Sequence, residues 1–129
     1  MPHTLPKKAR LKKQKAIEAL FARGRRLVVP PLRVQYLLQR KEDAAAAHVQ
    51  VAVSVPKKVF KKAVHRNRIK RLMREAWRLQ KGPLEQSLQQ KELHLQVFII
   101  YTSPELPTFD GVYEKMTAVL QKLQTTLPA

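Results

Sequence analysis

Apolar residues along this chain recur first at helical spacing and then at every second position. Within residues 14–23, apolar side chains fall three to four positions apart, and Gly24 follows where a helix usually ends. These apolar residues are Ala16, Ile17, Leu20 and Phe21. The spacing predicts a short amphipathic helix that ends before Gly24.

The next part of the chain alternates, which predicts strands. After two prolines at positions 30 and 31, apolar side chains occupy one strand face at Val34, Tyr36 and Leu38. Residues 49–55 alternate valine with polar or small residues until Pro56. A polar, alanine-rich connection at residues 40–47 joins the two strands, and residues 27–29 offer one further short strand.

The second half predicts two helices and a strand. A long basic helix runs to about Gln80 and ends at residues 82–83, a Gly-Pro pair, after which residues 84–92 predict one extra helical turn. Residues 97–101 are all apolar, which is expected of a strand covered on both faces. The final helix carries an apolar stripe formed by Val112, Met116, Val119, Leu120 and Leu123.

These elements follow one another as α, β, β, α, β, α. A chain of 129 residues with 44% apolar content buries one core of ordinary size. We therefore expect a single α+β domain over residues 1–129. Residues 1–13 are basic and contain two prolines, so we expect a loosely ordered arm there.

The composition excludes several classes of protein. No apolar run reaches the roughly 18 residues that cross a bilayer, and the first eleven residues lack the apolar stretch of a signal peptide. Cysteine is absent, which excludes disulfides, zinc ribbons and thiol nucleophiles. We therefore expect a cytoplasmic protein. We also expect no metal site of its own, because the four histidines lie too far apart for a local pair: His3, His48, His65 and His94.

The positive charge is concentrated in the first two-thirds of the chain. The net charge is +17, with +19 over residues 1–81 and −2 over the remainder. A charge spread for solubility would be more even, so a polyanion is the expected partner. An anionic membrane is the weaker alternative, because membrane-surface helices carry a bulky apolar face with interfacial aromatic residues.

The long basic helix has two contrasting faces. At about 100° per residue, Ile69, Leu72, Met73 and Ala76 fall on one side. The other side carries Asn67, Lys70, Arg71, Arg74 and Arg78. Like charges at this spacing repel, and nucleic-acid phosphates relieve that repulsion while releasing counterions. Residues 57–81 hold eleven basic residues and one acid, so nucleic-acid binding is favoured over an ordinary solvated surface.

Two residues of this helix have simpler interpretations than a role in catalysis. Glu75, its single acid, is expected to pair with Arg71 or Arg78, because a lone carboxylate is weak support for acid-base chemistry. Trp77 is expected to pack in the interior.

Residues 54–79 read SVPKKVFKKAVHRNRIKRLMREAWRL, and this stretch closely resembles the signature of the bacterial ribonuclease P protein family. In that family a strand ending in Lys-Lys leads into a helix with an Arg-Asn-Arg core. Weaker similarity extends to residues 7–13, to residues 20–24 and to the order of elements. The resemblance implies an α-β sandwich like the second domain of ribosomal protein S5, with a mixed sheet of about four strands, three helices and a left-handed βαβ crossover.

The resemblance also implies the function. A protein of this family has no catalytic residue and binds no cofactor alone, because its RNA subunit removes the 5′ leader of precursor tRNA with Mg²⁺. The implied partners are that RNA and the precursor tRNA, with no DNA and no membrane. The implied RNA-docking residues are Lys57, Lys58, Arg66, Asn67, Arg68, Lys70, Arg71 and Arg74. The implied leader cleft, between the first helix and the sheet, has Ile17, Phe21 and Tyr36. Packing in the interior is the alternative for Phe21 and Tyr36, because aromatic residues at helical or strand spacing usually face the core.

Two features depart from the family pattern. Ile17 stands where an aromatic residue is common, so apolar contact replaces base stacking there, and residues 82–93 form a longer connection, which we interpret as a surface insertion. A ribosomal protein remains the alternative. A helix-turn-helix DNA binder is disfavoured, because a strand and Pro56, rather than a helix and a tight turn, precede the basic helix.

Overall fold

The computed structural model describes residues 14–40 and 48–128, in which the chain forms four helices and four strands. In chain order these are α1 (Gln14–Arg23), β1 (Arg25–Val29), β2 (Leu32–Arg40), β3 (Val49–Ser54), α2 (Ala63–Gln80), α3 (Gly82–Gln90), β4 (Leu93–Tyr101) and α4 (Phe109–Thr125). The predicted order is confirmed, and the additional strand predicted at residues 27–29 is present as β1. The arm at residues 1–13 and most of the connection at residues 40–47 lie outside the described residues.

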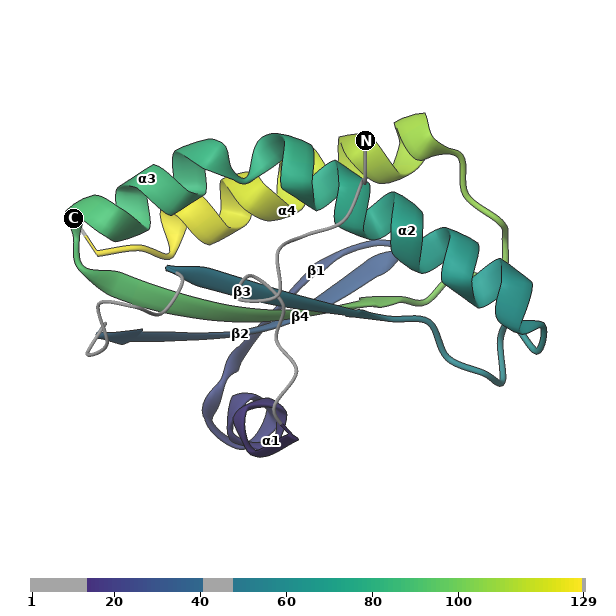
Figure 1. The fold of residues 1–129 in the computed structure, drawn as a ribbon, viewed down its shortest axis with the longest axis horizontal. Helices are drawn as coiled ribbons and strands as arrows, with labels where there is room; N and C mark the ends of the chain where they lie inside the picture. The colour runs from purple at the N-terminus through teal and green to yellow at the C-terminus, as the bar shows by residue number, and fades with distance from the viewer. Residues whose placement is uncertain (1–13, 41–47, 129) are drawn as a thin grey trace.

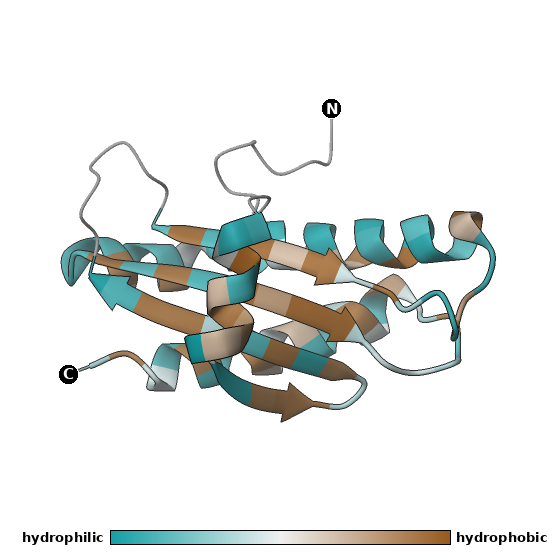
Figure 2. Ribbon diagram, turned by 90° about the horizontal axis from the view of Figure 1, so that it is seen from below, coloured by the Kyte–Doolittle hydropathy of each residue, from teal (hydrophilic) through white to brown (hydrophobic). Residues whose placement is uncertain are grey.

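All four strands belong to one mixed sheet in the order β1-β2-β4-β3. Strands β1, β2 and β4 pair antiparallel, whereas β3 pairs parallel with β4. The chain therefore crosses from β3 to β4 through α2 and α3. Seen with these helices toward the viewer and the strands pointing up, β4 lies to the left of β3 (Figure 1 and Figure 2), so the crossover is left-handed, against the general rule.

The helices are divided unequally between the two faces of the sheet. Figure 1 shows α2, α3 and α4 together above the sheet and α1 alone below it. The core fills the space between the three helices and the sheet, and hydrophobic bands recur along the strands in Figure 2 as their side chains alternate. Within the described residues, the opposite face of the sheet is covered only where α1 crosses it, and the part of this face beside α1 stays open.

Strand β4 corrects the expectation of a strand covered on both faces. Val97 and Ile99 are fully buried against the helices, but Phe98 and Ile100, which face the other way, are only half-buried. A ten-residue helix is too short to cover that second face. The continuous apolar run therefore marks a central strand with one face closed and the other partly open.

The segment after the basic helix is a helix in its own right rather than an extra turn. Helix α3 begins at Gly82, with Pro83 in its first turn. Proline is tolerated there because backbone amides of the first turn have no acceptor within the helix. Leu84 and Leu88, one turn apart, are buried in the core. The interpretation of residues 82–93 as a surface insertion is therefore wrong for this part, and the structure has four helices instead of the expected three.

Candidate RNA interface

Helix α2 packs with the face that its apolar residues predict. Ile69, Met73 and Ala76 have no exposed surface, and Leu72 is half-buried beside them. Trp77 is 1% exposed, which confirms that it packs in the interior. Burial of this stripe fixes how the helix is turned, so the opposite face must point to solvent.

The solvent face of α2 carries most of the predicted RNA-docking residues. Asn67, Arg68 and Arg71 are exposed, and Lys70 and Arg74 are half-buried. Lys57 and Lys58 are also exposed, in the connection that leads from β3 into α2. The structure thus brings these seven residues to one end of the molecule, on a helix and the loop before it.

Arg66 differs from the other members of this set. Its Nη1 atom donates hydrogen bonds to the carbonyl oxygens of Phe60, at 2.7 Å, and Lys61, at 2.8 Å. The same connection is closed at its start, where the amide of Phe60 donates to the carbonyl of Pro56 at 3.1 Å. Arg66 therefore ties the first turn of α2 to the loop that holds Lys57 and Lys58.

The single acid of the helix is paired as one of the two predicted alternatives. Glu75 accepts hydrogen bonds from Nε of Arg78, at 3.1 Å, and from Nη2 of the same residue. This hydrogen bond is the main reason that the pKa of Arg78 is raised above its ordinary value. The pair balances one charge near the end of α2 and leaves the earlier turns strongly cationic.

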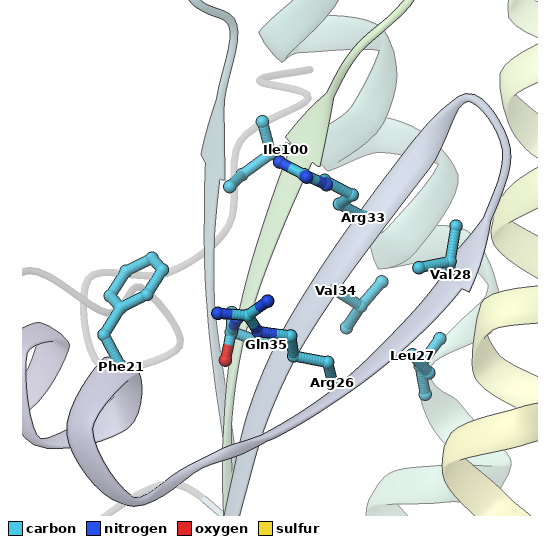
Figure 3. Close-up of a pocket in the computed structure, with 8 residues that line it drawn as sticks. All are labelled: Phe21, Arg26, Leu27, Val28, Arg33, Val34, Gln35 and Ile100. Carbon is cyan, nitrogen blue, oxygen red and sulfur yellow. The ribbon is translucent and has the colours of Figure 1, made fainter.

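A groove lies on the open face of the sheet, beside α1. Figure 3 shows Phe21 at one side, Arg26 reaching from β1 toward Gln35, and Arg33 reaching toward Ile100. This hollow has a volume of about 310 Å³. Its walls therefore combine an aromatic ring and aliphatic side chains with two guanidinium groups and one amide.

The groove continues toward the RNA-docking residues. A second hollow, of about 430 Å³, shares Val28, Arg33 and Ile100 with the first and extends to Lys58. One continuous surface thus leads from α1 across the sheet to the connection before α2. A strand lying along it would reach the docking residues at its far end.

Phe21 is the predicted cleft residue that the structure supports most directly. Its side chain is 47% exposed, and its ring meets that of Phe98 edge to face, with 5.1 Å between the centroids. Ile17 lies one helical turn earlier and is half-buried, but it lines neither hollow of the groove. The structure therefore brings Phe21, but not Ile17, into the groove.

Of the two interpretations of Tyr36, the structure supports packing in the core and places the residue outside this groove. Tyr36 lies opposite Val97 in the pairing of β2 with β4, and both belong to the core under α2, α3 and α4. Gln35, the next residue, faces the groove instead and is 9% exposed. The alternation of β2 itself contained this information, because Tyr36 shares a face with the core residue Val34.

Sequence reasoning missed the other polar residues of the groove for a different reason. Arg26, Arg33 and Gln35 come from two paired strands, and their common face becomes a site only because α1 crosses it. Within the described residues no hydrogen bond engages the amide of Gln35 or the guanidinium groups of these two arginines. All three are therefore available to a ligand.

The described part of the chain offers neither a metal site nor a membrane-spanning helix. Residues 14–40 and 48–128 contain no group of three His, Asp or Glu side chains placed to hold a metal ion. None of the helices formed by these residues combines the length and apolarity that a bilayer crossing requires.

Comparison with known proteins gives consistent matches. The family model described as Ribonuclease P matches residues 5–124. A protein named ribonuclease P protein component, from Porphyromonas gingivalis, is 39% identical over 125 residues, covering 97% of this chain and 90% of its own. A namesake from Chlorobaculum tepidum is 41% identical over 87 residues, covering 67% of this chain and 56% of its own. The RNase P protein structure from Staphylococcus aureus has a TM-score of 0.67 at 22% identity, covering 89% of this chain and 94% of that one.

Proposed function

The chain belongs to the ribonuclease P protein family, and from this premise we propose that it uses two surfaces, one for the RNA subunit and one for the precursor tRNA. As the protein component of ribonuclease P, it is part of an endoribonuclease complex that matures the 5′ end of tRNA, and it associates with the RNase P RNA. The alternative of a ribosomal protein has no support among these relatives. The two surfaces bind different RNAs in this proposal.

The first surface, which we name the docking face, is assigned to the RNA subunit. It consists of Lys57, Lys58, Asn67, Arg68, Lys70, Arg71 and Arg74. Arginine forks match phosphate oxygens in pairs, and each neutralised phosphate releases condensed counterions. Arg66 belongs to the surface indirectly, since it holds the loop that carries the two lysines.

The second surface, the groove, is assigned to the unpaired 5′ leader of precursor tRNA. The observation that carries this assignment is the continuous groove from Phe21 to Lys58, with an apolar floor and arginines along its walls. Single-stranded RNA is bound by such a combination, because bases stack on exposed rings while phosphates follow the cations. The amide of Gln35 adds a group that can hydrogen-bond to a base edge.

Hydrolysis of the leader is assigned to the RNA subunit together with its Mg²⁺ ions. In this proposal the protein supplies no catalytic group and no metal ligand. It increases the local concentration of leader and neutralises phosphate charge around the scissile bond. A cytoplasmic location forms part of the same proposal, because precursor tRNA must be within reach.

Reconstitution tests the proposal. Purified protein is combined with RNase P RNA and a precursor tRNA that carries a leader of several nucleotides, at a Mg²⁺ concentration too low for the RNA alone. We expect the protein alone to cut nothing and the complex to release the leader at a single site. Cleavage that does not depend on the protein under these conditions would overturn the assignment.

A further inference from the structure

A third hollow lies apart from the docking face and from the groove. It has a volume of about 380 Å³ and is lined by Arg23, Arg25, Tyr36, Leu37, Leu38 and Thr126. These residues come from the end of α1, from the start of β1, from β2 and from the residue that follows α4. Neither surface assigned above contains any of them.

The two arginines of this hollow have no partner within the chain as described. Arg23 and Arg25 are both exposed, and neither forms an ion pair or a hydrogen bond in residues 14–40 and 48–128. No acidic side chain lines the hollow. Two uncompensated guanidinium groups beside one concave surface favour an anion.

Tyr36 adds a neutral hydrogen-bond donor to the two guanidinium groups of the hollow. Arg25 lies directly opposite Tyr36 in the pairing of β1 with β2, so both side chains extend from the same face of the sheet. Tyr36 is 9% exposed, yet its hydroxyl has no hydrogen-bond partner among the described residues. No buried side-chain polar atom of the described residues lacks a partner, so this hydroxyl is reached by solvent at the hollow that Tyr36 lines, and it can donate to a bound anion.

The carbonyl groups at the end of α4 are not the partners of Arg23 and Arg25. Carbonyls in the last turn of a helix attract cations, but here side-chain hydroxyls already cover two of them. Thr126 donates its hydroxyl to the carbonyl of Leu123 at 2.6 Å, and Thr125 donates to that of Lys122 at 2.7 Å. Neither arginine hydrogen-bonds to this turn, so both remain available to an external anion.

We propose that this hollow, the arginine-tyrosine pocket, binds a phosphate group of an RNA strand. Two guanidinium forks and a phenolic hydroxyl donate to the phosphate oxygens, and the leucines exclude water from one side. The pocket itself rests on the geometry above. RNA as the source of the phosphate rests on the proposed function, because RNA is the polyanion that this chain meets in its complex.

The first arm of the test uses inorganic phosphate and the isolated full-length protein. Phosphate is titrated while NMR follows the side-chain Nε–H signals of Arg23 and Arg25. We expect saturable shifts at both, with binding about tenfold weaker in Arg25→Gln and several-fold weaker in Tyr36→Phe. Arg40→Gln removes the same charge from an exposed position outside all three hollows and should leave the binding unchanged. No saturable shift at these arginines would overturn the pocket.

The second arm distinguishes RNA from free phosphate. The salt dependence of binding is measured for wild type, Arg25→Gln and Arg40→Gln, with RNase P RNA and separately with precursor tRNA. One lost phosphate contact should reduce the slope of log K against log salt by about 0.7 to 0.9 for one of these RNAs. An unchanged slope with both, alongside intact phosphate binding, overturns RNA as the source. Cleavage at saturating protein and RNA tests the proposed function separately, because neither variant touches the docking face or the groove.

Discussion

Arg66 uses its guanidinium within the chain, whereas Asn67 and Arg68 present their side chains to solvent. Two carbonyl oxygens of the preceding connection accept hydrogen bonds from one nitrogen of Arg66. A signature motif of consecutive polar residues therefore contains two different roles. The family resemblance implied RNA docking for all three, because the path of residues 56–62, which brings two carbonyl oxygens to Arg66, cannot be derived from side-chain periodicity.

Lysine substitution separates these roles. Arg66→Lys keeps the charge but loses the fork that reaches two carbonyls, so affinity for the RNA subunit should fall about tenfold with an unchanged salt slope. Arg68→Lys keeps a phosphate contact at an exposed position, so its affinity should fall less than threefold. Binding measured over a range of salt concentrations checks both, and equal losses in the two variants would contradict the positioning role of Arg66.

Gly24 is required by a close approach of two backbone segments. A Cβ atom added there would lie 2.7 Å from the carbonyl oxygen of Tyr36 and would also clash with that of Leu20. Gly24→Ala should therefore lower the free energy of unfolding by about 1 to 3 kcal/mol. The control is Gly82→Ala, where nothing lies within 4 Å of the new atom, and this variant should change the free energy of unfolding by less than about 0.5 kcal/mol. Urea unfolding of both variants measures the difference, and similar values would contradict the clash.

At the scale of elements, periodicity predicted α2 well because one face of that helix is buried and the other is charged. The face of Tyr36 could also have been derived, since it alternates with Gln35 along β2. The position of α1 could not. Its contact with the sheet depends on residues far apart in sequence, such as Phe21 and Phe98, and a short helix can pack on either face. Periodicity therefore could not place the groove beside α1. The family resemblance implied a cleft there, and of the three residues named for it only Phe21 lines the groove.

The two faces of α2 should respond differently to truncation. Trp77→Ala removes a side chain that is 1% exposed and should destabilise the fold by about 3 to 5 kcal/mol. Arg71→Ala removes an exposed side chain and should change stability by less than about 0.5 kcal/mol while reducing the salt slope of RNA binding by about 0.7 to 0.9. Thermal unfolding and RNA titration of the same two preparations test this, and a stable Trp77→Ala protein would contradict the packing.

Across the whole molecule, the distribution of charge matches the surfaces that we propose for RNA binding. The first 81 residues carry +19 and the last 48 carry −2. The connection before α2 and the solvent face of α2 come from the basic part, and so does the open side of the sheet apart from residues of β4 such as Phe98 and Ile100. The side chains of β4 that face the helices and the apolar stripe of α4 belong to the core. The charge asymmetry of the sequence thus corresponds to a division between the proposed RNA-binding surfaces and the structural core.

The division of work between docking face and groove is tested most directly by comparing precursor and mature tRNA. Complexes with wild type, Phe21→Ala and Arg71→Ala are assembled with saturating RNA subunit, and the affinity of each for both tRNAs is measured. Phe21→Ala should reduce the preference for precursor over mature tRNA by about 5-fold to 150-fold, which corresponds to one lost base stack, while Arg71→Ala leaves that preference unchanged. An equal loss for both tRNAs with Phe21→Ala, or no loss at all, would contradict the account.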